Sequence, residues 1–577
     1  MRYQTRVLTK PTIIRREKTR IETLIARYLG EAVAVAIALL LWAPRLSGPI
    51  DLRWDAGVYY VLGTSLATGH GYRILSEPGS PEALQYPPLL PAVVALHQRV
   101  LGSTDPAVVA PWLRISYAVI FLAYALAVLA LARRYLQPGF AVTAMALSLL
   151  QVTTIFLSDA LFTELPFALI SVVFVLVAAD GWLAPRPWLR ETVSFVFAVA
   201  GFLLRTAGIA LLAAWVIEAL ARRRWRLALM RGVLAALPVI AWETHVAKVL
   251  ASYEYTHPAY EYQRAPYQIY NATYAESIGL VGRSGLGSRH MHLSAITAHL
   301  LTNTGPMVKG LGEAISTTEY YWRQLLLKAQ QPLLGRQVIP LGLVLVPIIS
   351  LSMLVIAGIG MLAYRRAWLM VLIILVSVAL IWITPWPDQF QRYLMPLAPF
   401  LTTGAMLAVA RFCAALSAAP VRPTIATFGR ISLIGLVLLA LIQQIYAGGS
   451  LFYDRASRGA SFVPGRGAVG PRFFYHGVLW RGWEKAIAWI EEHSAPDAIV
   501  LTRAPHLCYL YIGRHAVLPP IESNPGRVRH LLESVPVSYV ILDSLDSLPA
   551  VETDRPGWHR VQFVDGTRLY KRSSSAQ

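Results

Sequence analysis

The chain has 577 residues, of which 56% are hydrophobic and 15% are charged, and its mean hydropathy is +0.50. A soluble protein of this composition would expose far too much apolar surface, so the chain is expected to cross a membrane several times. The formal net charge of +20 does not indicate nucleic-acid binding, because Lys and Arg gather in short segments between apolar runs, as is typical of cytoplasmic loops.

The first predicted membrane span runs from about Tyr28 to Leu46. Residues 1–27 before it are rich in Lys and Arg, which are retained on the cytoplasmic side of a membrane. No small-residue cleavage site follows the apolar run, so we expect a retained anchor rather than a signal peptide. The amino terminus is therefore predicted to be cytoplasmic.

Residues 28–446 form the predicted transmembrane domain, with about eleven helical spans. Each apolar run has roughly the 15–25 residues that a bilayer crossing requires. The ten runs after the first begin near Pro111, Phe140, Leu165, Thr192, Ala207, Gly232, Val338, Trp368, Leu394 and Ile431. Arginine-rich loops such as Arg133-Arg134 and Arg365-Arg366 then fall on the cytoplasmic side. The fifth and sixth runs are short, and their junction Leu204-Arg205-Thr206 is interpreted as a tight hairpin whose tip reaches the outer face.

Two long segments of this domain, residues 47–110 and 251–337, are predicted to lie outside. The first contains the proline-rich stretch Tyr86-Pro87-Pro88-Leu89 and a helical stretch from Val58, a pattern typical of short helices along the interface. The second is rich in tyrosine, which is typical of chain at headgroup depth.

Residues 447–577 are predicted to form an extracytoplasmic linker and a small soluble α/β domain. Apolar residues from Trp483 to His493 have helical spacing, and Val537 to Leu542 has the composition of a strand. Asp565-Gly566 indicates a hairpin turn. The cysteines, Cys413 and Cys508, provide neither a disulfide framework nor a cysteine-rich metal site.

Ionisable residues gather at the predicted outer ends of the spans. They are Asp51, Asp55, Asp159, Glu164, Arg205, Asp388 and Arg392, with Tyr393 beside the last. Burying such groups near lipid costs several kcal/mol unless they pair, line water or bind a ligand. Each residue alone is compatible with a solvated loop charge, but the set favours one shared cavity. Carboxylates beside arginines suit group transfer from a lipid phosphate, which needs a base for the acceptor and guanidinium groups for the departing phosphate.

Six short motifs follow one another along the chain. The first outer segment contains Trp54-Asp55-Ala56-Gly57-Val58-Tyr59-Tyr60, Gly69-His70-Gly71-Tyr72 and Tyr86-Pro87-Pro88-Leu89. Three later motifs are Ser158-Asp159-Ala160-Leu161-Phe162-Thr163-Glu164, Leu204-Arg205-Thr206-Ala207-Gly208 and Gln391-Arg392-Tyr393-Leu394-Met395-Pro396-Leu397. The order of these motifs resembles that of bacterial GT-C glycosyltransferases, and most closely the family 39 group with its protein O-mannosyltransferases and lipid A aminoarabinose transferases. The resemblance covers about Val33 to Leu407.

The resemblance implies that Asp55 is the catalytic base, which activates an acceptor hydroxyl for attack on the anomeric carbon. Asp51 is a supporting candidate, and either aspartate could instead cap the following helix. At Tyr86 relatives have a lysine or histidine before Pro-Pro-Leu, so a cationic phosphate contact is missing there. Arg392 and Arg205 are the candidates to supply that charge, with snorkelling to the interface as the alternative for both.

Four further residues are candidates for substrate binding: Tyr59, Glu164, Tyr393 and His257. Glu164 is equally compatible with a solvated hairpin tip, and a lone histidine such as His257 is more often packed or exposed than a ligand. No metal or other cofactor is expected, because family 39 relatives generally act without an essential metal. Asp51 and Asp55 alone would be a weak divalent-cation site.

We therefore predict a bacterial inner-membrane glycosyltransferase that uses a polyprenyl-phosphate sugar and an acceptor that is a glycan, lipid or protein. Nucleotide sugars are not supplied at the outer face, and no glycine-rich phosphate loop occurs in a soluble segment. The alternatives are a lipid-linked oligosaccharide ligase or polymerase, which would need no aspartate base in the first loop, and a secondary transporter. A transporter would place ionisable groups near the bilayer midplane, where these spans carry few.

Overall fold

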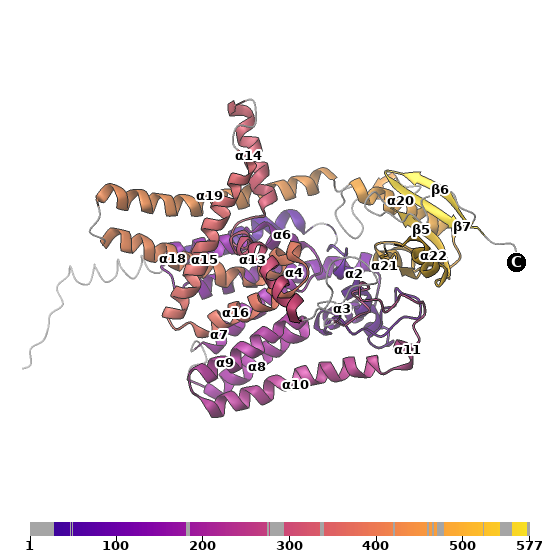
Figure 1. Cartoon of the computed structure of the whole chain (residues 1–577), viewed down its shortest axis with the longest axis horizontal. Helices are drawn as coiled ribbons and strands as arrows, with labels where there is room; N and C mark the ends of the chain where they lie inside the picture. Colours follow the sequence, from indigo (N-terminus) through magenta and orange to yellow (C-terminus); the bar gives the residue numbers. More distant parts are fainter. Residues whose placement is uncertain are drawn as a thin grey trace, which may run out of the picture.

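A computed structural model describes most of the chain. The described residues are 28–46, 48, 50–179, 185–273, 276, 293–334, 340–418, 422–458, 461–463, 467–469, 478–522, 524–542 and 557–573. The predicted basic segment 1–27 lies outside them. A large helical body occupies one end of the described part, and a small unit with a β-sheet occupies the other (Figure 1).

Seven helices of the described part are long and apolar enough to cross a membrane, so the chain is a multi-pass membrane protein. They span Tyr28–Arg45, Pro106–Ala132 (α4), Pro187–Leu204 (α8), Trp225–Leu250 (α10), Gly342–Tyr364 (with α15, Leu345–Tyr364), Pro387–Ala418 (with α18, Ala398–Ala418) and Pro423–Ala456 (in α19, Pro423–Arg458). A bent pair, Pro138–Leu149 (α5) and Val152–Asp159 (α6), makes up to eight. Three shorter apolar helices lie where the sequence predicts the remaining spans: Glu164–Ala178 (α7), Ile209–Ala221 (α9) and Trp368–Ile383 (α16).

The predicted break at Arg205 is present. Arg205 is extended, with φ −158° and ψ 145°, and a 3-10 turn at Thr206–Gly208 leads into α9. The helices α8 and α9 lie side by side (Figure 1). A Cβ atom on Gly208 would lie 2.3 Å from the backbone of Gly201, so a glycine is required for this close approach.

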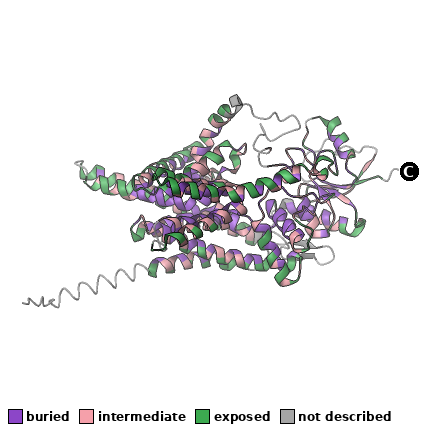
Figure 2. Ribbon diagram, turned by 90° about the horizontal axis from the view of Figure 1, so that it is seen from below, coloured by how far each residue is buried: buried purple, intermediate pink, exposed green. Residues whose placement is uncertain are grey.

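Apolar side chains cover the outer faces of α10 and α19, at opposite edges of the helical body (Figure 1). On α10 the exposed residues include Leu229, Val233, Leu237 and Ile240, and on α19 they include Ile431, Ile434, Leu438, Ile442 and Ile445. Their spacing of three or four residues places them on one face of each helix. Figure 2 shows buried residues gathered in the interior of the helical body and exposed residues along its outside. Such faces suit contact with lipid rather than water.

Shorter helices occupy the segments that were predicted to lie outside. The first segment contains Asp55–Ala67 (α2) and Leu89–Leu101 (α3), which pack against each other. The second contains Tyr253–Thr256 (α11), Leu293–Glu313 (α13) and Glu319–Leu334 (α14). The short helix Phe390–Leu394 (α17) precedes α18 and carries Arg392.

The C-terminal unit has the predicted α/β architecture. Its five-stranded sheet has the order β4-β3-β5-β7-β6, in which β3 pairs in parallel with β4 and β5, and β7 pairs antiparallel with β5 and β6. The strands are Ile499–Leu501 (β3), Ala516–Val517 (β4), Val537–Leu542 (β5), Trp558–Val564 (β6) and Thr567–Arg572 (β7), and the helices are Val478–His493 (α20), Pro505–Ile512 (α21) and Pro525–Glu533 (α22). Asp565 and Gly566 both have positive φ and join β6 to β7, as the hairpin motif predicts.

The region interpreted as a linker contains regular structure. Its helix α19 continues to Arg458, and two short antiparallel strands follow at Ser461–Val463 (β1) and Gly467–Val469 (β2). The sheet unit also packs on both outer segments: the Ala516 amide donates to the Ser76 carbonyl at 2.8 Å, and the Tyr262 hydroxyl donates to the Leu518 carbonyl at 3.1 Å.

Candidate functional site

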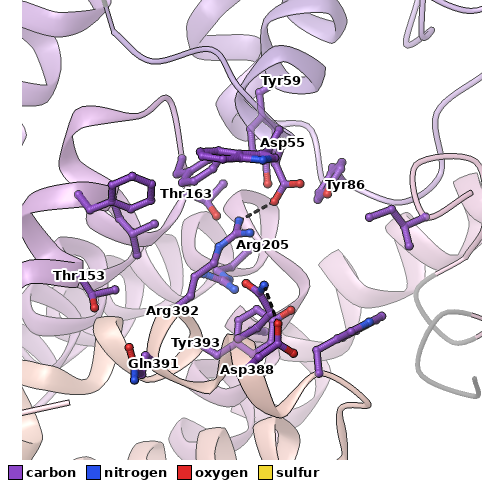
Figure 3. Close-up of a pocket in the computed structure, with 18 of the residues that line it drawn as sticks. Asp55, Tyr59, Tyr86, Thr153, Thr163, Arg205, Asp388, Gln391, Arg392 and Tyr393 are labelled. Carbon is purple, nitrogen blue, oxygen red and sulfur yellow. Dashed lines mark hydrogen bonds and ion pairs between the residues drawn. The ribbon is translucent and has the colours of Figure 1, made fainter. Parts of the chain in front are cut away.

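A cavity of about 750 Å³ opens where the first outer segment meets the ends of several membrane helices (Figure 3). Its polar lining includes Asp55 at the start of α2, Tyr86 before α3, Arg205 at the α8–α9 turn, and Asp388, Arg392 and Tyr393 before α18. Tyr59, one turn after Asp55, also lines it. Segments more than 300 residues apart therefore meet in one cavity. Of the charged residues predicted to share it, Asp55, Arg205, Asp388 and Arg392 line it, whereas Asp51, Asp159 and Glu164 do not. Asp159 is paired with Arg45, Arg114 and Arg455 instead.

Four charged side chains form a continuous row of ion pairs beside this cavity, in the order Asp55, Arg392, Glu164 and Arg205. Arg392 Nη2 lies 2.5 Å from Asp55 Oδ2, and Arg392 Nε donates to Glu164 Oε1 at 2.6 Å. The Nη1 atom of Arg205 lies 3.3 Å from the same Glu164 oxygen. Two carboxylates thus balance two guanidinium groups, which meets the requirement that buried charges be paired. Figure 3 shows Arg392 pointing toward Asp55.

Glu164 is the inner partner of both arginines. Its side chain is fully buried, and it does not line the cavity. Arg392 also lies over the ring of Phe162, with its guanidinium carbon 4.5 Å from the ring centroid. The guanidinium of Arg392 is therefore held on one side by Glu164 and Phe162, while its Nη2 faces Asp55.

The Asp55 carboxyl is buried, which by itself raises its pKa, but the charge and hydrogen bond of Arg392 outweigh burial, so the pKa is lowered overall. Hydrogen bonds from Tyr86 and Tyr270 act in the same direction. The Tyr270 hydroxyl donates to Asp55 Oδ1 at 3.3 Å. Burial raises the pKa of both phenols, so they remain protonated donors. Asp55 is consequently held as a carboxylate.

A second cavity of about 540 Å³ adjoins the first. Apolar side chains from α8, α9, α10, α16 and the turn before α18 form most of its wall, including Phe202, Ile209, Val239 and Leu380. The two cavities share the following lining residues: Gln85, Arg205, Thr206, Ala207 and Tyr393. Arg205 therefore stands at the boundary between the first cavity, which carries charged side chains and is the more polar of the two, and the second, whose wall is mostly apolar.

Two predicted site residues lie away from the cavity. The Asp51 carboxylate accepts hydrogen bonds from the backbone N–H, Nε and Nη2 of Arg53, and Asp51 does not line the cavity. His257 is exposed and stacks on Tyr253, with ring centroids 3.9 Å apart, so the structure does not bring it to the site either. Asp51 is placed instead to hold the turn before α2.

Sequence reasoning missed Tyr270 and His506. Tyr270 lies in the tyrosine-rich outer segment, where no spacing distinguishes it from its neighbours, and it contacts Asp55 across 215 positions. His506 belongs to α21 of the C-terminal unit, and its ring centroid lies 4.9 Å from that of Tyr270. The contact of Tyr270 with Asp55 is revealed only by the packing of the two outer segments, and that of His506 with Tyr270 only by the packing of the C-terminal unit on them. Within the described residues, no group of three or more His, Cys, Asp or Glu side chains could hold a metal ion.

No protein-family model matches the chain, and no curated protein matches it. Among solved structures it is similar to the archaeal oligosaccharyltransferase AglB from Archaeoglobus fulgidus, in complex with an inhibitory peptide and a dolichol-phosphate, with 16% identity and a TM-score of 0.51 over 96% of this chain and 75% of that one. It is also similar to ArnT from Cupriavidus metallidurans in the apo state, with 11% identity and a TM-score of 0.50 over 95% of this chain and 98% of that one. Both are membrane glycosyltransferases of the GT-C fold, and the chain has the fold that its motifs predicted.

Proposed function

We propose that the protein is an integral membrane glycosyltransferase that takes a sugar from a polyprenyl-phosphate donor and transfers it to an extracytoplasmic acceptor. The observation that carries this proposal is the ion-paired chain of Asp55, Arg392, Glu164 and Arg205 at the junction of a polar and an apolar cavity. A lipid-linked sugar needs both environments, with its charged phosphate between them.

The apolar cavity suits the lipid chain of such a donor. Its wall is mostly aliphatic and aromatic, and it reaches the polar chamber at Arg205 and Tyr393. The related fold of AglB has been solved with a dolichol-phosphate, which is a donor carrier of this chemical class. The phosphate then lies within reach of the Arg205 and Arg392 guanidinium groups, whose planar donors match phosphate oxygens.

The polar cavity suits the sugar and the acceptor. Asp55 accepts the proton of an acceptor hydroxyl, the acceptor oxygen bonds to the anomeric carbon, and the bond from that carbon to the phosphate oxygen breaks. The electron pair leaves with the polyprenyl phosphate, whose negative charge Arg392 and Arg205 stabilise. Attack from the face opposite the phosphate inverts the anomeric carbon, as the family 39 resemblance implies.

A direct assay tests this function. Purified protein in detergent is incubated with polyprenyl-phosphate monosaccharides, and separately with the matching nucleotide sugars, in the presence of membrane glycolipid and glycan fractions as acceptors. We expect release of polyprenyl phosphate and a mass increase of one sugar in an acceptor fraction with the lipid-linked donors alone. Transfer from nucleotide sugars in lipid-free detergent would contradict the proposal.

A further inference from the structure

We propose that His506 of the C-terminal unit is a positioning residue for the Asp55 base and acts through the ring and hydroxyl of Tyr270. This inference rests on the proposed glycosyl transfer and assigns the C-terminal unit a part in it. The C-terminal unit would then complete the active site rather than serve only as an appended soluble domain.

The first support is a row of three contacts. The Tyr270 hydroxyl donates to Asp55 Oδ1 at 3.3 Å. The rings of Tyr270 and His506 meet edge to face, with centroids 4.9 Å apart and an interplanar angle of 74°. His506 Nδ1 lies 2.6 Å from the Ser76 hydroxyl oxygen. The imidazole is thus fixed on one side by the first outer segment and supports the tyrosine on the other.

The second support is the close packing of the two helices that carry Asp55 and His506. Gly57, two residues after Asp55, has no room for a side chain: a Cβ atom there would lie 2.9 Å from the Leu52 carbonyl oxygen and 3.1 Å from the His506 Cβ. The backbone of α21 therefore lies directly on the first turn of α2. A displacement of α21 would therefore shift the first turn of α2 and with it Asp55, because close-packed protein interiors transmit small displacements.

The third support is the state of the imidazole. His506 is 4% exposed, and burial lowers its pKa to about 3, although the nearby Asp55 charge acts in the opposite direction. The ring is therefore neutral at physiological pH. Its Nε2 atom is buried and has no hydrogen-bond partner among the described residues. A buried nitrogen without a hydrogen bond destabilises the folded protein. If this position served only for packing, an apolar ring would therefore be favoured over a histidine.

Glu77, next to Ser76, helps to fix the position of the loop that carries Tyr270. Its carboxylate, at 2% exposure, accepts hydrogen bonds from Asn271 at 2.6 Å and from the Tyr260 hydroxyl at 3.2 Å. Asn271 directly follows Tyr270, so the loop that presents Tyr270 is anchored beside Ser76, the partner of His506. The first outer segment, the second outer segment and the C-terminal unit thus converge behind Asp55.

The experiment is a double-mutant cycle on transfer by the full-length protein in detergent, with polyprenyl-phosphate sugar as donor. His506→Ala and Tyr270→Phe should each lower kcat about tenfold, the scale of one lost hydrogen bond, while the KM for the donor changes less than about twofold. The double variant should also be lowered about tenfold rather than about a hundredfold, because both substitutions break one row of contacts. His493→Asn, at an exposed histidine of the same unit, is the matched control and should leave kcat unchanged.

Two more variants separate positioning from folding. His506→Phe keeps a ring against Tyr270 and should recover part of kcat, whereas His506→Asn keeps a polar atom near Ser76 and should not. Thermal unfolding in detergent should be recorded for each. Three results would overturn the positioning role. They are a double variant whose loss of kcat is the product of the two single losses, a raised donor KM with unchanged kcat, and full activity in His506→Ala. By contrast, an inactive wild type or a fully active Asp55→Asn would remove the proposed function itself.

Discussion

Arg392 Nη2 lies 2.5 Å from Asp55 Oδ2, although 337 positions separate the two residues. The contact joins the start of α2 to the segment before α18, and Arg392 lowers the pKa of the Asp55 carboxyl against the effect of burial. A phosphate that binds Arg392 would compete with Asp55 for the same guanidinium. Donor binding and the strength of the base are therefore coupled through one side chain.

Replacing Arg392 should weaken donor binding. Arg392→Ala should raise the KM for the polyprenyl-phosphate sugar at least about tenfold, and Arg392→Lys should recover only part, because an ammonium group cannot contact Glu164 and a phosphate through a planar fork. Steady-state kinetics at varied donor concentration measures this, with Arg365→Lys at an exposed helix end as the control. Full recovery by lysine would mean that only the positive charge matters.

The pH dependence of transfer should depend on the same pair. Asp55 acts as a base only when it is ionised, so activity is lost as the pH falls through its pKa. In the wild type this pKa lies below the ordinary value of 3.8, so Asp55 should cause no loss of kcat above about pH 5. In Arg392→Ala burial acts without the arginine charge, and the acid limb of kcat should move up by at least about one pH unit. If the acid limb of kcat measured at saturating donor does not move in Arg392→Ala, Arg392 does not control the pKa of Asp55.

Glu164 should be required for stability more than for substrate contact. It is the fully buried partner of Arg392 and Arg205, so Glu164→Gln leaves two guanidinium groups with one carboxylate and should cost about 3 kcal/mol of unfolding free energy. Thermal unfolding in detergent tests this, with the exposed Glu491→Gln as the control. An unchanged melting temperature would show that water or lipid compensates both arginines.

The sidedness of the membrane domain can be tested separately. An odd number of spans after a cytoplasmic amino terminus places the C-terminal unit outside. Alkaline phosphatase fused after Lys571 should then be active, and a fusion after Arg224 should be inactive. An inactive fusion after Lys571 would contradict both the orientation and a shared outer-face site.

The sequence predicted the elements whose signals are local. The break at Arg205 follows from two short apolar runs, and the β6–β7 hairpin follows from Asp565-Gly566. Placing Asp55 with Arg392 required only that both lie at the same predicted face of the membrane. The role of Tyr270 could not be predicted, because its contact with Asp55 depends on how a loop packs against α2 and on His506 from another unit. Asp51 was the supporting candidate for the base, and only the structure shows that its carboxylate is bound by Arg53 and does not line the cavity.

Asp55 is proposed as the base for transfer from a polyprenyl-phosphate sugar, and a comparison of three purified proteins separates this role from donor binding. Single-turnover transfer and donor binding are measured for purified wild type, Asp55→Asn and the control Asp105→Asn, an exposed residue that caps α4. We predict that Asp55→Asn binds donor within about threefold of wild type but transfers at least about 10²-fold more slowly, the usual contribution of a positioned base, while Asp105→Asn is unchanged. Near-normal transfer by Asp55→Asn would contradict the account.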